Sequence, residues 1–213
     1  MKFTVDEELK IEGCQVRAAI FETGKIVNKV AELEDEKSSV FKRILDSNAE
    51  NPISHEYKRL HDKYGQPGIL GPAEFLVNLA KKNRRLPNIN CVVDAYNLIS
   101  ALTFLSIGAH DLNNVKGNLK LTVCNGNEIY TPLGSGEKQK VNAGEYACTD
   151  DEKVICWLDI KQCNETKITK DTKKYIIYIQ GNSKTSKELL EEALNLVVNY
   201  QTRFCAAKLL ELI

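Results

Sequence analysis

The chain has 213 residues, 43% of them hydrophobic, and its 29 basic and 29 acidic side chains give a formal net charge of zero. This length and apolar content allow a substantial core, and zero net charge by itself disfavours binding of a nucleic acid, DNA included, through the overall charge of the protein. No apolar run approaches the roughly 20 residues of a membrane span, and the charged amino terminus has no apolar signal region. We therefore expect a soluble, cytoplasmic protein whose residues 1–213 form one domain.

The seven cysteines indicate reduced thiols. Their number is odd and the sequence has no Cys-x-x-Cys pair, which argues against a zinc ribbon, and a cytosolic chain keeps such thiols reduced. Most of them lie inside apolar runs, where a thiol behaves as a small hydrophobic group. We expect neither a metal nor a cofactor.

The first half of the chain is predicted to be mainly helical. Gly65 closes one helix, and Gly71–Pro72 begins another because proline is accepted at the first helical position. The elements expected here are a buried strand over 14–22, helices over 38–45 and 53–64, a helix from 71 whose apolar stripe reaches Ala80, and a helix over 94–105.

The second half is predicted to consist of hairpins followed by one helix. Asn125–Asn127 indicates a tight hairpin because Asn and Gly tolerate positive φ, and Asp150–Lys153 indicates a second one. Thr185 and Glu188 are spaced as a capping box. The elements expected here are strands over 119–124, 128–133, 145–149, 154–158 and 175–180 and a helix over 186–212. Helices at both ends with hairpins between them favour a segregated α+β fold.

The most informative stretch runs from Leu86 to Asp111. Its segment Leu-Pro-Asn-Ile-Asn-Cys-Val-Val-Asp-Ala-Tyr-Asn resembles the pattern Asn-Pro-Val-Val-Asp-x-Thr-Asn in the editing (B3/B4) domain of the phenylalanyl-tRNA synthetase β subunit. The likeness continues through Gly117-Asn-Leu-Lys-Leu, Thr131-Pro-Leu-Gly and the loop 166–172. The whole length is similar to free-standing relatives of that domain, which lack the aminoacylation module.

This resemblance implies a fold and a reaction. The fold is a β-sandwich of unusual topology with helices packed against it, here with an α/β amino-terminal part of about residues 1–85 and a pocket-bearing core of about 86–213. The reaction is hydrolysis of the ester of a mischarged aminoacyl-tRNA. Such an ester is already activated, so the site needs only a positioned water, a hydrogen-bonded oxyanion and a recognised side chain.

The resemblance also implies the site residues. Asn97 matches the pocket asparagine of the family, whereas the histidine of the family falls at Gly108 and the glutamate, which reads the hydroxyl of a tyrosyl substrate there, falls at Asn164. The resemblance therefore does not imply a tyrosyl substrate for this chain. His110 and Glu165 are the nearest groups of those types. The implied catalytic residues are Asn97, His110 and Glu165, and the implied substrate-binding residues are Asp94, Tyr96, Gly108, Thr131, Asn164, Thr166 and Thr169. We expect the pocket between the start of the Asp94 helix, a turn at 107–111 and the loop 162–169.

Several of these residues have an alternative structural role. Asn97 can satisfy buried backbone groups, and Asp94 can serve as the N-cap of its helix. His110 can be a turn histidine held by Asp111. The residue types alone leave these alternatives open.

A basic segment precedes the motif. Between Lys58 and Arg85 there are seven basic residues against two acidic ones. Its carboxyl-terminal part, Lys81, Lys82, Arg84 and Arg85, is expected to contact tRNA phosphates. The alternative is that these cations complement a helix dipole. The sequence is also compatible with a homodimer.

Two classes of function follow. The first is an enzyme, a free-standing deacylase that hydrolyses mischarged aminoacyl-tRNA. The second is a module that binds tRNA or an amino acid without hydrolysing an ester. The absent histidine favours the module, whereas Asp94, Asn97 and the threonine-rich loop favour a functional pocket.

Overall fold

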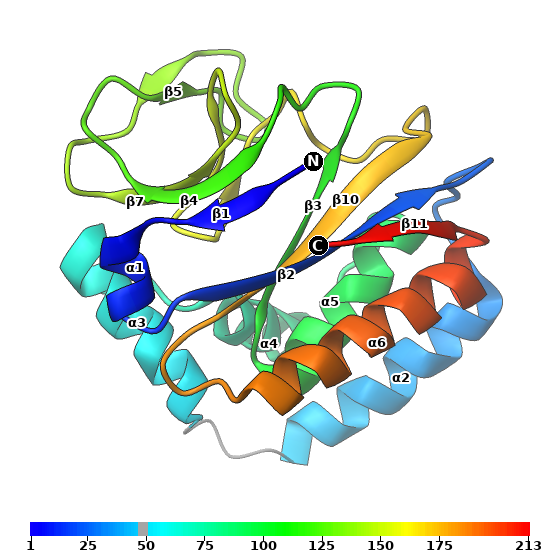
Figure 1. Cartoon of the computed structure of the whole chain (residues 1–213). Helices are drawn as coiled ribbons and strands as arrows, with labels where there is room; N and C mark the ends of the chain where they lie inside the picture. The colour runs from blue at the N-terminus through cyan, green and yellow to red at the C-terminus, as the bar shows by residue number, and fades with distance from the viewer. Residues whose placement is uncertain (47–50) are drawn as a thin grey trace.

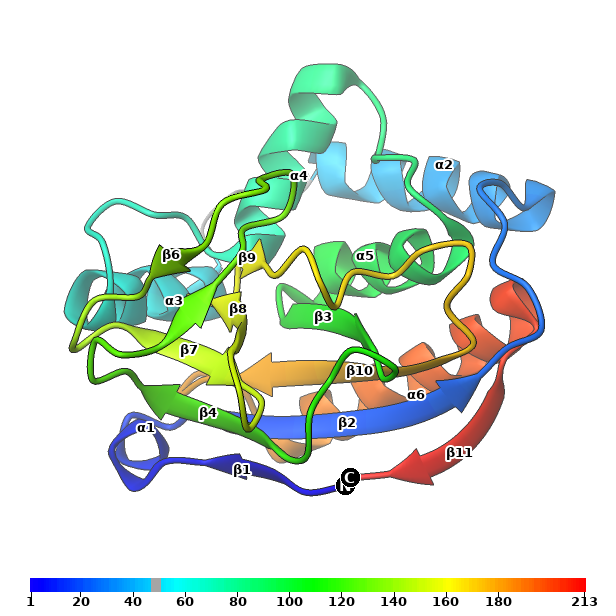
Figure 2. The same cartoon turned by 90° about the horizontal axis from the view of Figure 1, so that it is seen from above.

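The computed structural model describes residues 1–46 and 51–213, which form the layers shown in Figures 1 and 2. The helices are α1 (Glu7–Ile11), α2 (Ala31–Asp46), α3 (Pro52–Tyr64), α4 (Pro72–Asn83), α5 (Cys91–Thr103) and α6 (Lys187–Cys205). The strands are β1 (Phe3–Val5), β2 (Gln15–Glu22), β3 (Ser106–Asp111), β4 (Leu119–Val123), β5 (Ile129–Tyr130), β6 (Gln139–Lys140), β7 (Tyr146–Thr149), β8 (Val154–Trp157), β9 (Lys161–Gln162), β10 (Lys174–Gly181) and β11 (Lys208–Leu212). None of the helices in these two ranges is long and apolar enough to span a membrane.

Two sheets pack face to face, and helices cover the outer face of one of them. The four-stranded sheet has the order β11-β2-β10-β3, and the five-stranded sheet has the order β1-β4-β7-β8-β9. Side chains alternate along β10, as they do in any strand. Ile177 and Ile179 therefore join the core beneath α2, α5 and α6, whereas Ile176 and Tyr178 join the core between the sheets. The expected β-sandwich with packed helices is confirmed.

Local signals place several elements where the sequence predicts them. Helix α3 has proline in its first turn and Gly65 as its C-cap, and α4 has Gly71 as its N-cap and proline at its start. Strands β7 and β8 form the expected antiparallel hairpin, closed by Asp150, whose Oδ1 accepts hydrogen bonds from the backbone N–H groups of Glu152 and Lys153. Helix α2 begins at Ala31, seven residues before the predicted start at 38.

The hairpin predicted at Asn125–Asn127 is wrong. Gly126 does have a positive φ of 92°, but β4 pairs with β1 and β7, and β5 pairs with β6. The Glu128 carboxylate accepts hydrogen bonds from the backbone N–H groups of residues 125, 126 and 127. This contact closes a local turn that leads out of the sheet, so the strands on either side of it do not pair.

The predicted cap and end of the last helix are also wrong. Ser186 is the N-cap and accepts from the Leu189 N–H at 3.1 Å, while the Thr185 hydroxyl accepts from the Asn182 N–H. The helix ends at Cys205, where Ala206 takes a left-handed conformation with φ 48°. The following residues form β11 and pair with β2, because the edge of the four-stranded sheet offers them backbone partners.

Candidate functional site

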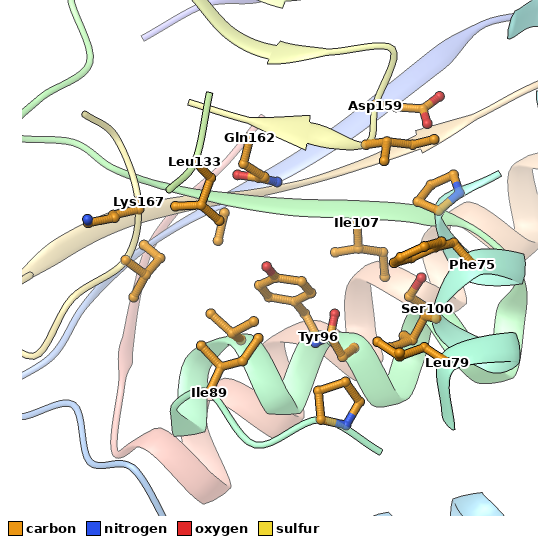
Figure 3. A pocket seen from close by; sticks show the side chains of 18 residues that line it. Phe75, Leu79, Ile89, Tyr96, Ser100, Ile107, Leu133, Asp159, Gln162 and Lys167 are labelled. Atoms are coloured by element: carbon orange, nitrogen blue, oxygen red, sulfur yellow. The ribbon is translucent and has the colours of Figure 1, made fainter. Parts of the chain in front are cut away.

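A cleft of about 450 Å³ lies between α4, α5, β3 and the segments that follow β5 and β8 (Figure 3). This volume is within the usual range for small-molecule sites, roughly 300–1,000 Å³. Its lining residues are Pro72, Phe75, Leu76, Leu79, Pro87, Ile89, Val93, Tyr96, Asn97, Ser100, Ile107, Ala109, Leu133, Asp159, Ile160, Gln162, Lys167 and Ile168. The lining is thus mainly apolar and includes residues from α5, from β3 and from the loop after β9.

Asp94 orients the helix that forms the floor of the cleft, but it does not line the cleft. Asn90 is the N-cap of α5 and accepts from the Val93 N–H at 3.1 Å. The buried Asp94 carboxylate accepts from the Ile89 N–H at 2.9 Å and from the Lys37 ammonium at 3.0 Å, and burial raises its pKa. The expected roles of Asp94 as N-cap and as substrate contact are therefore both corrected: it ties α5 to α2 and to the preceding loop.

Helix α5 presents two uncharged polar groups to the cleft, Tyr96 and Asn97. The Tyr96 ring points from α5 across the cleft toward Gln162 and Leu133 (Figure 3), and burial raises its pKa, which keeps the hydroxyl protonated. Within residues 1–46 and 51–213, neither the Tyr96 hydroxyl nor the Asn97 side-chain amide has a hydrogen-bond partner. In contrast, the Ser100 hydroxyl, which also lines the cleft, donates a hydrogen bond to the Leu105 carbonyl at 2.7 Å. The alternative role of Asn97, holding buried backbone groups, is not observed.

Gly108 makes room for a third polar group, Gln162 from β9. A Cβ at position 108 would lie 2.9 Å from Gln162 Nε2 and 3.3 Å from the Tyr178 ring. The Gln162 amide therefore packs directly on the Gly108 backbone at the edge of β3 and lines the cleft. It has no side-chain hydrogen bond to any residue that the structure describes. The sequence placed this residue at the start of the expected pocket loop 162–169 but did not indicate it as a site residue, because a single glutamine carries no pattern and its packing on Gly108 is visible only in three dimensions.

His110 lies outside the cleft. Residues 107–111 form the buried strand β3 rather than the expected turn, so Ile107 and Ala109 line the cleft while His110 points to the opposite face. Its ring stacks on Tyr178 between the sheets, and its Nδ1 is 2.8 Å from the Thr166 hydroxyl. Burial lowers its pKa to about 3, so the imidazole is neutral. The turn role next to Asp111 is corrected as well.

The predicted acidic group also lies outside the cleft. The Glu165 carboxylate accepts from the Thr131 hydroxyl at 2.7 Å and from the Cys163 thiol at 2.6 Å. Burial opposes its charge, but these two hydrogen bonds hold its pKa below the ordinary value. Asn164 accepts from the Lys167 ammonium at 3.0 Å. Thr131, Asn164 and Glu165 thus stabilise one loop and do not line the cleft.

Two threonines of the same loop shape its backbone. The Thr166 hydroxyl bonds to His110, and the Thr166 carbonyl accepts from the Asp111 N–H at 2.8 Å. The Thr169 hydroxyl accepts from the Asp171 N–H at 3.2 Å, and its own N–H donates to Thr172. Neither side chain lines the cleft, but their bonds position Lys167 and Ile168, which do.

Asp159 follows the end of β8 and lies next to the cleft, although its carboxylate points away from Tyr96 (Figure 3). Leu158 and Asp159 both have left-handed backbone conformations, with φ 48° and 51°. The buried Asp159 carboxylate accepts from the Tyr146 hydroxyl and from the Gln180 amide, and it faces the buried His61 ring at 3.3 Å. This cluster turns the chain from β8 into β9 and so carries Gln162 to the cleft.

The carboxyl-terminal part of the basic segment lies at the end of the helix that forms one wall of the cleft. Lys81 and Lys82 occupy the last turn of α4, and Arg84 is its C-cap with φ 55°. Lys82, Arg84 and Arg85 are exposed. The same helix supplies Phe75, Leu76 and Leu79 to the cleft.

Comparison with known proteins relates this architecture to one family. No curated protein matches the chain. A crystal structure of an N-terminal fragment of the phenylalanyl-tRNA synthetase β subunit from Pyrococcus horikoshii is similar to 98% of the chain, with a TM-score of 0.52 and 16% identity. This chain covers 50% of that fragment, and the likeness concerns the fold. Since the model of the B3/4 domain matches residues 71–206, nearly two thirds of the sequence, the chain belongs to the B3/4 domain family.

Proposed function

We propose that the cleft binds the aminoacyl end of a charged tRNA and hydrolyses its ester, which makes the protein an aminoacyl-tRNA deacylase. The observation that carries this proposal is the set of uncharged polar groups at Tyr96, Asn97 and Gln162. All three lie in a mainly apolar cleft, and none has a hydrogen-bond partner among the described residues. Tyr96 is buried and Asn97 and Gln162 are half-buried. Because polar groups buried in proteins are normally hydrogen-bonded, these three are available to a ligand and a water molecule.

The proposed reaction needs no ionisable base in the cleft. Water oxygen forms a bond to the ester carbonyl carbon, the bond to the ribose oxygen breaks, and a proton from the water passes to that leaving oxygen. The amide N–H groups of Asn97 and Gln162 are suited to donate to the carbonyl oxygen as its negative charge develops. Their amide oxygens can accept from the attacking water and so orient it.

The second candidate is a module that binds the same aminoacyl end without hydrolysis. One observation favours it: His110 and Glu165 lie outside the cleft, and the Asp159 carboxylate is held by Tyr146 and Gln180. Of the described lining residues, none therefore offers a general base that faces the cleft. The two candidates share the ligand and differ only in the fate of the ester.

A deacylation assay separates these candidates. The full chain is incubated with a panel of labelled aminoacyl-tRNAs, and both the ester remaining and the tRNA bound are measured. We expect Asn97→Ala to slow deacylation of the preferred substrate by about 10²-fold or more, as loss of one positioned oxyanion donor does. Asn78→Ala, at an exposed position of α4 outside the cleft, is the matched control. Binding without loss of ester identifies the module, and neither binding nor hydrolysis refutes both candidates.

A further inference from the structure

We infer that the aminoacyl side chain accepted by this cleft is large, apolar and uncharged, as in leucine or phenylalanine. This inference rests on the proposed function, because it takes an aminoacyl end as the ligand. It goes further in naming the class of amino acid, which follows from the lining of the cleft, its two charged residues and its rim.

The walls of the cleft are apolar on opposite sides. Helix α4 contributes Leu76 and Leu79, β3 contributes Ile107 and Ala109, and the loop after β9 contributes Ile168. A ligand group between these walls exchanges water for hydrocarbon on both of its faces. That exchange favours an apolar side chain roughly in proportion to its area, so a larger aliphatic or aromatic group gains more than a small one.

The described lining contains two charged residues, and neither serves as a counter-ion inside the cleft. The Asp159 carboxylate is occupied by Tyr146 and Gln180 and points away from Tyr96 (Figure 3). Lys167 is exposed, and its ammonium, bound to the Asn164 amide oxygen, is directed away from Tyr96 (Figure 3). An ionised ligand side chain would therefore lose its hydration without gaining an ion pair, which is strongly unfavourable.

The rim of the cleft points to the same class of ligand. Phe75, Ile89 and Leu133 line the cleft and are 54%, 53% and 56% exposed. Large apolar side chains gathered at the mouth of a cleft are typical of a binding surface rather than of scattered surface residues. The uncharged groups of Asn97 and Gln162 match the carbonyl and amino groups that every aminoacyl ester has, so the apolar walls are left to select the side chain.

Binding of aminoacyl analogues that cannot be hydrolysed tests this inference apart from catalysis. Adenosine probes that carry the aminoacyl group on a 3′-amide, with leucyl, phenylalanyl, seryl, lysyl or aspartyl side chains, are titrated into the full chain by calorimetry. We expect the leucyl or phenylalanyl probe to bind at least about tenfold more tightly than the other three. Equal or tighter binding of the seryl, lysyl or aspartyl probe overturns the inference, and so does the absence of binding by every probe.

The outcomes of the two proposals are distinguishable. An apolar preference without deacylation of the matching aminoacyl-tRNA supports the inference and refutes the enzyme. Deacylation that favours charged side chains supports the enzyme and refutes the inference.

A charge placed in the wall of the cleft gives a second test. Leu79 is half-buried on α4 and lines the cleft. Leu79→Glu should therefore lower the affinity for the leucyl probe at least about tenfold and raise the affinity for the lysyl probe. Asn78→Glu adds the same charge one residue away on the exposed face, and it should change neither affinity. Ile168→Glu, in the loop wall, repeats the test should Leu79→Glu lose its native circular dichroism. Unchanged probe preference in a folded variant overturns the inference.

Discussion

Gly108 connects the packing of β3 to the polar groups of the cleft, and the variant Gly108→Ala tests that connection. The backbone at this position is not left-handed, so alanine fits the strand itself. Its Cβ, however, would lie 2.9 Å from Gln162 Nε2 and 3.3 Å from the Tyr178 ring. The ring is buried and surrounded by the core between the sheets, whereas the amide is the end of a flexible side chain. We expect the glutamine amide to move.

The size of each effect follows from these contacts. Replacing glycine by alanine at a compatible backbone position stabilises a protein by about 0.4–1 kcal/mol, because it lowers the conformational entropy of the unfolded chain. Overpacking a core, in contrast, costs about 1–3 kcal/mol of stability. Because Gln162 can swing away, the net loss of unfolding free energy should be close to 1 kcal/mol. In the cleft, the displaced amide loses one neutral hydrogen bond to the ligand, about 0.5–1.5 kcal/mol, which corresponds to roughly 2- to 12-fold weaker binding.

A double-mutant cycle measures this coupling. Binding of the leucyl probe is compared for wild type, Gly108→Ala, Gln162→Ala and the double variant, with urea denaturation to determine stability. Residues in contact show non-additive effects, so Gly108→Ala should weaken binding no further once Gln162 is already alanine. Fully additive losses would show that Gly108 does not act through Gln162, and the reasoning would be refuted.

Two further predictions concern pH and tRNA. Burial opposes protonation of His61, but the Asp159 carboxylate raises its pKa above the ordinary value of 6.5. The resulting stabilisation is complete below pH 6.5 and is lost as pH rises through the raised pKa. Urea denaturation between pH 5 and pH 9 should therefore show a stability that declines with pH and a weaker decline in Asp159→Asn; a flat wild-type profile would contradict it. Replacing the four cations in the carboxyl-terminal part of the basic segment by glutamate should abolish tRNA binding and its steep dependence on salt, whereas unchanged affinity would favour the helix-dipole role. The substituted residues are Lys81, Lys82, Arg84 and Arg85.

The sequence by itself determined the family and the elements whose signals are local. Proline in the first turn and Gly65 at the end delimit α3, and Asp150 closes the β7–β8 hairpin through backbone groups two and three residues away. Such signals can be recognised in a sequence because the interacting groups are covalently close. The segment from Leu86 to Asn97 carries the family resemblance for a related reason: cap, helix and cleft residues follow one another along the chain.

Only the tertiary structure decided which of these residues line the cleft. The Asp94 carboxylate is bound by the Lys37 ammonium, which is 57 residues distant in sequence, and no local sequence pattern predicts that pair. The pairing of β3 with β10 converts a predicted turn into a strand, and alternation along it then places Ala109 in the cleft and His110 between the sheets. Gln162 enters the cleft because a glycine at position 108 leaves space for its amide. Each of these outcomes depends on contacts between distant segments, which exist only once the sheets and helices have packed together.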